Sequence, residues 1–305
     1  MSHSRPLTAA VAAATLAVLA AAAAAPAART GALAYTRYSP SGGAIVVTGI
    51  GGAKARALTP SSLASSDAAW SPDGRRIAFS ATSGPTANID IYVMAADGSG
   101  RRRLTTSVEA DSDPTWSPDG DSIAFERDRG CEAEGCGAEE VWVMRSDGKD
   151  QQRLTAGSTL DGDPAWSPDG RHIAFTSQQG IGASALFTML ADGRQRKRIT
   201  KAINADNPSW APNGRTIAFD ANLAPQGASP ADVNVYTVSA NGARSPKQLI
   251  ADASDPAWSP DGSRLAYVNH RQAIAAVPAA GGSATQLVAA GPRGVSQPAW
   301  QPLGG

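Results

Sequence analysis

A thirteen-residue phrase that recurs along the chain constrains its fold more than any other feature. The clearest copy, DPAWSPDGRHIAF, runs from Asp163 to Phe175 and joins a tryptophan to a short apolar run through a Pro-Asp-Gly turn. The tryptophans of its full and partial copies are Trp70, Trp116, Trp166, Trp210, Trp258 and Trp300. They lie 42 to 50 residues apart, and a period of this length indicates an array of supersecondary units that bury their faces against one another.

Each repeat predicts four β-strands, joined as two hairpins. The tryptophan phrase is one hairpin, because Pro-Asp-Gly reverses the chain between two short β-prone runs. The second hairpin lies between tryptophans, as in IYVMAADGSGRRRLT from Ile91 to Thr105, where Asp-Gly tolerates the positive φ that a tight turn needs. We name the four strands a (with the tryptophan), b (Ile-Ala-Phe), c (Ile-Tyr-Val-Met) and d (Arg-Leu-Thr).

The two ends of the repeat array are complementary. Near the C-terminus, residues 297–300 supply a strand a without the rest of its repeat. Near the N-terminus, residues 33–35, 45–47 and 56–59 supply strands b, c and d without a strand a. A linear solenoid has no need of this complement, whereas a closed ring does. We therefore expect an all-β fold, a six-bladed β-propeller of four-stranded blades that is closed by a blade split between the two ends.

The repeated phrases resemble those of a known family. Trp-Ser-Pro-Asp-Gly followed by Ile-Ala-Phe, and then Ala-Asp-Gly followed by Arg-Leu-Thr, look like the TolB-like propeller repeat. That repeat also occurs in the propellers of prolyl-oligopeptidase-type enzymes. The resemblance extends over residues 31–305 and recurs five times nearly intact, and it implies the same six-bladed propeller fold.

The N-terminal segment predicts export. Residues 7–25 contain only Ala, Val, Leu and Thr, with Arg5 before them and Ala25-Pro26-Ala27 after them. This order of charge, apolar core and small residues is typical of a secretory signal peptide. We expect a signal peptide over residues 1–27 and a single propeller domain over residues 28–305, in a periplasmic or extracellular protein that is not integral to the membrane after cleavage. The alternative is an uncleaved anchor, for which alanine is a poor residue.

The charge balance argues against nucleic acid as a partner. The chain has 27 basic and 27 acidic side chains, so no bulk charge attracts a polyanion. Two basic runs, residues 101–103 and 194–198, fall at strand d, the outermost strand of a blade. Basic residues there block edge-to-edge pairing, and no aromatic residues alternate with them as in a single-strand binding surface. We expect a monomer without nucleic acid and without a cofactor.

Loop lengths predict which face carries the function. The a–b and c–d turns have nearly constant lengths, whereas the b–c and d–a loops vary from repeat to repeat. Variable loops on a rigid scaffold commonly bind ligands, so we expect the site on the face of these loops or in the channel mouth that they surround. Candidate binding residues in the b–c loops are Glu132 and Glu134 in the second repeat and His270 and Arg271 in the fifth.

A polar residue opens strand a in every repeat. These residues are Asp67, Asp113, Asp163, Asn207, Asp255 and Gln297. Because strand a lines the channel of a propeller, we expect them to form a ring near its mouth. The ring is a candidate site for a cation or for the donor groups of a partner. The interpretation that we favour from sequence is structural, with each residue capping backbone N–H groups of its own d–a loop. The spacing predicts no dedicated metal cage.

Cys131 and Cys136 are the only cysteines. In an exported chain they predict a local disulfide, because four intervening residues leave enough chain to satisfy disulfide geometry. The alternative of a metal site lacks further cysteine or nearby histidine ligands.

Catalytic motifs are absent from the sequence. It has no serine nucleophile elbow, no P-loop and no paired histidines at metal-ligand spacing, and we predict no catalytic residue. The expected function is a non-catalytic module that binds a protein or a cell-envelope component. The alternative is a channel-site enzyme, either a metal-dependent or a histidine-assisted lyase or hydrolase, since His270 lies on the variable face and could serve acid–base chemistry.

Overall fold

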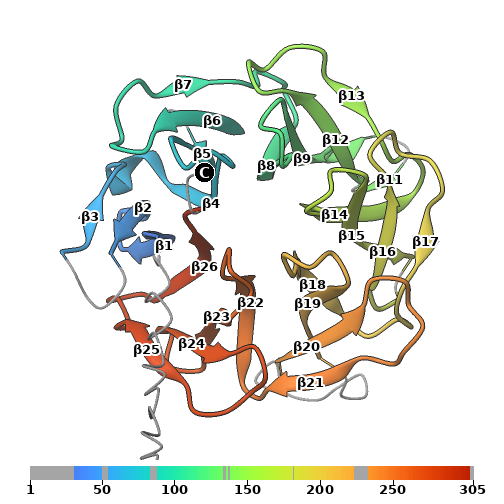
Figure 1. Ribbon diagram of the computed structural model, residues 1–305. Helices are drawn as coiled ribbons and strands as arrows, with labels where there is room; N and C mark the ends of the chain where they lie inside the picture. Colours follow the sequence, from blue (N-terminus) through green and yellow to red (C-terminus); the bar gives the residue numbers. More distant parts are fainter. Residues whose placement is uncertain are drawn as a thin grey trace, which may run out of the picture.

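The computed structural model describes residues 31–49, 54–82, 88–132, 135–136, 138–180, 182–222 and 233–302, with only the backbone described for residues 131, 132, 135 and 136. Six antiparallel sheets of four strands each surround a central channel (Figure 1). The predicted all-β, six-bladed propeller is therefore confirmed. No described helix is both long and apolar enough to cross a membrane. The predicted signal peptide lies outside the described residues.

In every blade the strands follow the order a, b, c and d from the channel to the perimeter. The strands a are β4 (Ser65–Trp70), β8 (Ala110–Trp116), β14 (Thr159–Trp166), β18 (Ala205–Trp210), β22 (Ala253–Trp258) and β26 (Val295–Trp300). The strands b are β1 (Leu33–Ser39), β5 (Arg76–Thr82), β9 (Ser122–Asp128), β15 (His172–Gln179), β19 (Thr216–Ala221) and β23 (Arg264–Asn269).

The outer half of each blade is formed by strands c and d. The strands c are β2 (Gly42–Thr48), β6 (Ile89–Ala95), β12 (Glu139–Arg145), β16 (Ala185–Leu190), β20 (Asn234–Ser239) and β24 (Ile274–Pro278). The strands d are β3 (Arg56–Ala57), β7 (Arg102–Arg103), β13 (Gln152–Arg153), β17 (Lys197–Arg198), β21 (Lys247–Ile250) and β25 (Thr285–Val288). A short hairpin, β10 (Cys131–Glu132) and β11 (Gly135–Cys136), and a 3-10 helix, η1 (Ser61–Leu63), complete the described elements.

We number the blades along the chain. Blade 1 contains β4 to β7, blade 2 contains β8, β9, β12 and β13, and blades 3, 4 and 5 contain β14 to β17, β18 to β21 and β22 to β25. The sixth, or split, blade has the order β26-β1-β2-β3.

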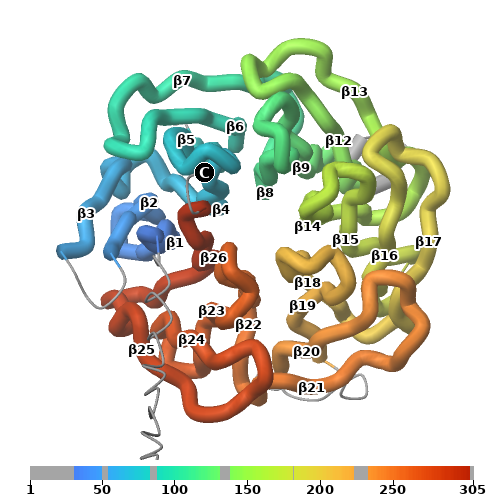
Figure 2. The backbone as a smooth tube through the Cα atoms, in the orientation of Figure 1, coloured from blue at the N-terminus to red at the C-terminus, as the bar shows by residue number. Residues whose placement is uncertain are grey.

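The split blade joins the two ends of the described chain. β26 pairs antiparallel with β1, with Leu33 opposite Trp300, and Figure 2 shows the red C-terminal strand beside the blue N-terminal ones. Gln301 extends this connection, because its backbone N donates to the Ala32 carbonyl at 2.8 Å and its side-chain Nε2 donates to the Gly74 carbonyl of blade 1 at 3.0 Å. The predicted closure by a split blade is confirmed.

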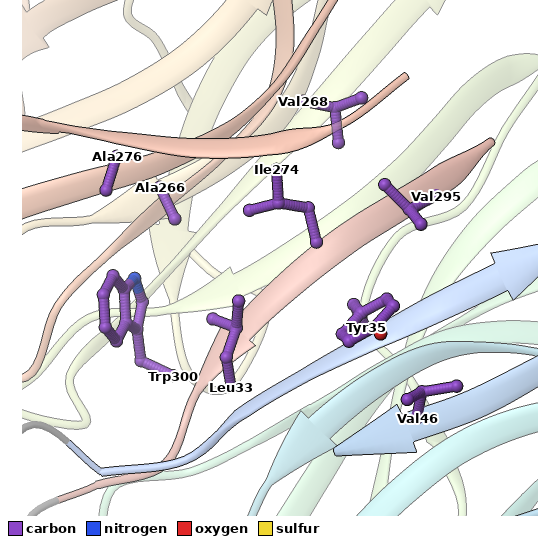
Figure 3. Close-up of a cluster of buried hydrophobic side chains, with 9 residues drawn as sticks. All are labelled: Leu33, Tyr35, Val46, Ala266, Val268, Ile274, Ala276, Val295 and Trp300. Atoms are coloured by element: carbon purple, nitrogen blue, oxygen red, sulfur yellow. The ribbon is translucent and has the colours of Figure 1, made fainter. Parts of the chain in front are cut away.

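Apolar side chains fill the space between neighbouring blades. In one cluster, Leu33, Tyr35 and Val46 of the split blade pack with Val268 and Ile274 of blade 5, as Figure 3 shows. The tryptophans belong to the same interfaces: Nε1 donates to a carbonyl of the preceding blade from Trp70, Trp116, Trp210 and Trp300 at 3.0 to 3.2 Å. These four tryptophans therefore join neighbouring blades.

The threonine of the Arg-Leu-Thr phrase has a specific backbone partner. Its hydroxyl accepts a backbone N–H of strand c at 2.9 to 3.0 Å, in the pairs Thr59 with Ile45, Thr105 with Ile91, Thr155 with Val141 and Thr200 with Leu186. In blades 4 and 5 the threonine is replaced by Ile250 and Val288. There strand d is four residues long, and these two residues pair with strand c directly.

The glycines of the described c–d turns pack against the preceding blade. Gly148 has a φ of +89°, and a Cβ at this position would lie 2.8 Å from the Leu104 carbonyl oxygen of blade 1. Gly193 is in the same situation against Leu154, at 2.7 Å, whereas a Cβ at Gly98 would lie 3.3 Å from the nearest atoms of Leu58. The Asp-Gly turn is therefore required for two reasons, the positive φ of the turn and the close approach of the neighbouring blade.

Basic residues of strand d link neighbouring blades. Arg102 donates to the Asp147 carbonyl at 3.0 Å, and Lys197 donates to the Asn241 carbonyl at 2.9 Å. These bonds join the outer strand of one blade to the c–d turn of the next. They add a second role to the edge protection that the sequence predicts.

The interface at Gly148 yields a testable prediction. We expect Gly148→Ala to lower the free energy of unfolding by about 2–4 kcal/mol, which combines left-handed backbone strain with overpacking against Leu104. Gly100→Ala is the matched control, because Gly100 also has positive φ (+64°) but open space around a Cβ, so only about 1–2 kcal/mol of backbone strain is expected. Urea denaturation measures both. Equal losses in the two variants would show that the blade contact is unimportant.

Candidate functional site

The six residues of the predicted ring come together in the central channel. Asp67, Asp113, Asp163, Asn207, Asp255 and Gln297 all line one cavity, and each has a positive φ between 49° and 56°. In the innermost strands β4, β8, β14, β18, β22 and β26 the register shifts at these residues. A β-bulge re-aims a side chain out of the regular strand pattern, and Asp and Asn tolerate left-handed backbone better than most residues.

Hydrogen bonds connect the ring from blade to blade. The Asp113 backbone N donates to Ser80 Oγ of blade 1 at 3.2 Å. The Asp163 backbone N donates to Glu126 Oε2 of blade 2 at 3.2 Å. Gln297 donates through Nε2 to Asp67 Oδ1. The bonds described for the ring thus run around the channel, which differs from our interpretation of these residues as caps of their own d–a loops.

A second layer of polar residues lies behind the ring, and our sequence analysis missed it. It consists of the residue that follows the strand-b aromatic in five blades, which is Thr36, Ser80, Glu126, Thr176 and Asp220; blade 5 has the apolar Val268 at this position. Glu126, which is half-buried, and Asp220, which is buried, add two carboxylates to those of the ring. The sequence does carry a signal for this layer, because a polar or charged residue directly follows the buried Ile-Ala-Phe run of strand b.

Three of these carboxylates are close enough to hold one cation. Single carboxylate oxygens of Asp113, Glu126 and Asp163 all lie within 4.8 Å of one another. In blade 4, next to blade 3, Asp220 is 4% exposed, and its Oδ1 has no hydrogen-bond partner among the described residues. Oxygen donors in this arrangement suit a hard divalent cation, and they equally suit an ammonium or guanidinium group.

The channel environment raises the pKa values of these acids. Burial, with the nearby Glu139 charge, raises the pKa of Glu126 to about 8. Burial raises the pKa of Asp255 to about 6. The pKa of Asp113 is well above its usual value because of burial and of the Asp67 and Glu126 charges, and that of Asp163 because of burial and the Asp206 charge. The described cavity lining contains no basic side chain, so these acids lack a cationic partner within it.

The cavity is a funnel that begins at the ring. Its volume is about 460 Å³, and its other lining residues follow the ring residues along the strands, including Trp166, Pro168, Trp210 and Pro212. Because strand a ends at the a–b turn, the funnel extends from the ring toward the a–b turns. The variable b–c and d–a loops lie at the opposite end of the strands.

The other predicted binding residues lie on these loops, apart from the funnel lining. His270 is exposed, and its backbone N donates to the Asp252 carbonyl at 3.1 Å. The Arg271 backbone N donates to Asn269 Oδ1 at 3.0 Å. Glu132 has only its backbone described, in β10, and Glu134 lies outside the described residues. A role of these four residues in binding stays a prediction.

The two cysteines face each other across the β10–β11 hairpin. Cys131 and Cys136 are direct partners in the antiparallel register. Directly opposed residues in such pairs have Cα atoms about 4.5–5.5 Å apart, which falls within the range that a disulfide spans. Their side chains are outside the described part of the chain, so the disulfide stays a prediction that the register favours.

Comparisons with known proteins agree with the repeat. The sequence model of the family described as "TolB beta propeller domain" matches residues 20–135 and 132–304. A search of curated protein sequences finds no significant match.

Several solved structures share the fold. TolB from Acinetobacter baumannii superposes with a TM-score of 0.74 at 21% identity, covering 90% of this chain and 67% of that one. A chain of the hydrazine synthase of Kuenenia stuttgartiensis gives 0.73 at 16% identity, covering 89% and 46%. A chain of a nidogen/laminin complex gives 0.68 at 11% identity, covering 88% and 98%. At these identities the likeness concerns the fold alone.

The buried acids predict a pH dependence of stability. Below about pH 4.5 Glu126 is protonated in both states, and as the pH rises toward about 8 the unfolded chain loses this proton while the folded protein retains it. Stability is therefore lost as the pH rises through the folded-state pKa. We expect Glu126→Gln, which keeps an acceptor for the Asp163 N–H, to raise the free energy of unfolding by about 1–2 kcal/mol at pH 9 and to change it little at pH 4.5.

Thermal unfolding between pH 4.5 and 9 measures this effect. Asp121→Asn, at an exposed turn carboxylate, is the control and should leave the pH profile unchanged. A loss of stability in Glu126→Gln that is equal at every pH would contradict the electrostatic explanation.

The hairpin register gives a second prediction for this region. We expect unreduced, exported protein to carry a Cys131–Cys136 disulfide, which intact mass spectrometry detects as resistance to alkylation until reduction. The bond closes a short loop, so its removal should cost only about 2 kcal/mol in the chain-entropy description. Two freely alkylating thiols in the unreduced protein would refute the disulfide.

Proposed function

The chain belongs to the TolB beta propeller domain family, and from this premise we propose that it is an exported, non-catalytic binding module for another protein or for a cell-envelope component. Its binding site is the acidic funnel, which receives a basic group of the partner. Export rests on the apolar segment of residues 7–25 with its preceding arginine and following small residues.

One observation carries the proposal, a group of half-buried carboxylates at one end of an open cavity whose described lining has no basic side chain. Buried charges are normally paired, because an isolated charge in a protein interior costs several kcal/mol. Here Asp113, Glu126 and Asp163 lie together, and the described funnel lining has no lysine or arginine to neutralise them. A cationic group of a partner would supply the missing charge and would release the protons that the raised pKa values retain.

Protein binding is also consistent with the wider fold group. The nidogen/laminin complex, one of whose chains shares this fold, is by its own title an assembly of two proteins. That likeness shows only that a similar propeller occurs in a protein complex. It supports the proposal without identifying a partner for this chain.

A metal-dependent enzyme in the channel is the second candidate. The cluster of Asp113, Glu126 and Asp163 favours it, since three carboxylate oxygens can hold a hard cation. The described funnel lining, however, contains no histidine, cysteine or lysine beside this cluster, which are frequent acids, bases and nucleophiles. Binding is therefore the function that the site supports better.

Charge-neutralising variants test the funnel. We expect Asp113→Asn/Asp163→Asn to reduce partner capture from an envelope extract of the producing organism at least about tenfold, as expected when one side of a buried charge pair is removed. Asp97→Asn/Asp147→Asn is the matched control, because it removes the same charge from exposed c–d turns. Mass spectrometry should find proteins that the wild type and this control retain and the funnel variant loses.

Variants of the b–c loop residues give the result that would contradict the funnel assignment. If Glu132→Lys/Glu134→Lys or Arg271→Glu abolishes capture while the funnel variant retains it, the partner docks on the b–c loop face and the funnel assignment is wrong. Weak, salt-sensitive losses in the loop variants, with a complete loss in the funnel variant, would place these loops at the rim of the interface.

A further inference from the structure

The interfaces between blades contain a second kind of site, above the tryptophan of strand a. At the interface of blades 1 and 2, the Arg76 guanidinium lies over the Trp116 ring, with its Cζ 4.5 Å from the ring centroid. Trp116 is 6% exposed. Arg76 is the first residue of β5, and it covers the tryptophan of the following blade.

The residue at this strand-b position correlates with the exposure of the next tryptophan. The first residues of β5, β9, β15, β19 and β23 are Arg76, Ser122, His172, Thr216 and Arg264. Among these five interfaces, Trp116 and Trp300, which follow the two arginines, are buried, whereas Trp166, Trp210 and Trp258, which follow the other three residues, are partly exposed. At the sixth interface Trp70 is buried although the split blade has Ala32 at this position. Arginine at this position thus accompanies a covered indole.

At the interface of blades 2 and 3, where Ser122 replaces the arginine, a hollow of about 440 Å³ remains. Trp166, Met144 and Leu154 contribute its apolar walls. Asp119, Asp150 and Asp192 contribute carboxylates. The hollow lies on the face of the a–b and c–d turns, and Trp166 is the one residue named here that also lines the funnel.

Two of the three acids of this hollow are held in the charged form. Hydrogen bonds from Ser117 Oγ and from the Asp121 backbone N hold the pKa of Asp119 below its usual value. Hydrogen bonds from the Arg194 side chain and backbone do the same for the pKa of Asp192.

The one basic residue of the lining pairs with two nearby acids, one of which also lines the hollow. Arg145 contacts Asp147 at 3.3 Å and Asp150 at 3.7 Å, and its side chain is 60% exposed. Asp150 thus pairs with Arg145, and Asp192 pairs with Arg194 at 2.6 Å. Asp119 is the lining carboxylate without a basic partner among the described residues, and it gives the hollow a negative balance.

We propose that this hollow binds an arginine side chain of a protein partner. The guanidinium would lie on Trp166 as Arg76 lies on Trp116, its aliphatic stem would pack on Met144 and Leu154, and the carboxylates would accept its hydrogen bonds. A planar guanidinium stacks on an indole and hydrogen-bonds at its edge at the same time. The contact of Arg76 with Trp116, one blade away, therefore has the geometry that we propose for the bound arginine.

The direct test uses N-acetyl-L-argininamide as a probe and follows the tryptophan indole N–H signals by NMR, with the Trp166 signal assigned through Trp166→Phe. We expect a saturable shift of the Trp166 signal with this probe and none with N-acetyl-norleucinamide, which has the stem without the charge. No Trp166 shift with the arginine probe would overturn the proposal.

Two variants test whether the probe binds in the hollow itself. Ser122→Arg restores the covering residue found in blade 1, so the Trp166 indole should become covered and the probe should no longer shift its signal. Asp119→Asn/Asp192→Asn removes two charges and should weaken binding at least about threefold. It keeps the turns, because blade 4 has Asn213 and Asn241 at the same positions. A probe shift that is unchanged in both variants would overturn the proposal.

The inference does not depend on the funnel. Asp113→Asn/Asp163→Asn should leave the probe-induced Trp166 shift intact, so a failure of the proposed funnel function and a failure of this site are distinguishable. A Trp166 signal that moves in Arg145→Ala without any probe, together with no response of the wild type, would show that Arg145 fills the hollow and would refute an external ligand.

Discussion

Each blade of this propeller is covered by its neighbours, and the pairing of β26 with β1 makes that cover continuous. A four-stranded sheet has two faces, and neither could be left exposed without leaving apolar residues such as Phe79 and Ile123 in water. Closing the ring covers the apolar faces of all six blades at once. It is therefore the constraint on which the inner strands, their bulges and the channel depend.

Closure also brings acidic side chains close together at the centre of the ring. Six strands that converge on one axis bring Asp67, Asp113, Asp163 and Asp255 into a common space, and the layer behind them adds Glu126 and Asp220. The raised pKa values express the cost of burying these acids. Groups whose pKa values are strongly perturbed within a cleft are candidates for function, and a fold that needed only to close would not require them.

The features that the sequence predicted correctly are periodic and local. The tryptophan spacing, the Asp-Gly turns and the complementary ends each follow from residues close in sequence, or from a count of repeats. The structure supplied reasons for some of them, such as the hydroxyl of Thr105 that accepts the Ile91 N–H.

The features that the sequence did not predict depend on contacts between blades. Glu126 is adjacent to Asp163 only because blade 2 lies against blade 3. The hollow at Trp166 lies beside Ser122, which stands where Arg76 stands one blade earlier, and neither residue is unusual by itself. The direction of the funnel follows from the bulges at the ring, which a strand pattern does not reveal.

The most direct test of this account is the removal of residues 297–305, which deletes most of β26 while leaving every other blade intact. Thermal unfolding followed by circular dichroism should show a large fall in the midpoint together with loss of cooperativity, because the ring can no longer close and β1 becomes an exposed edge. An unchanged midpoint would contradict closure by the split blade, and with it the convergence of the acidic ring.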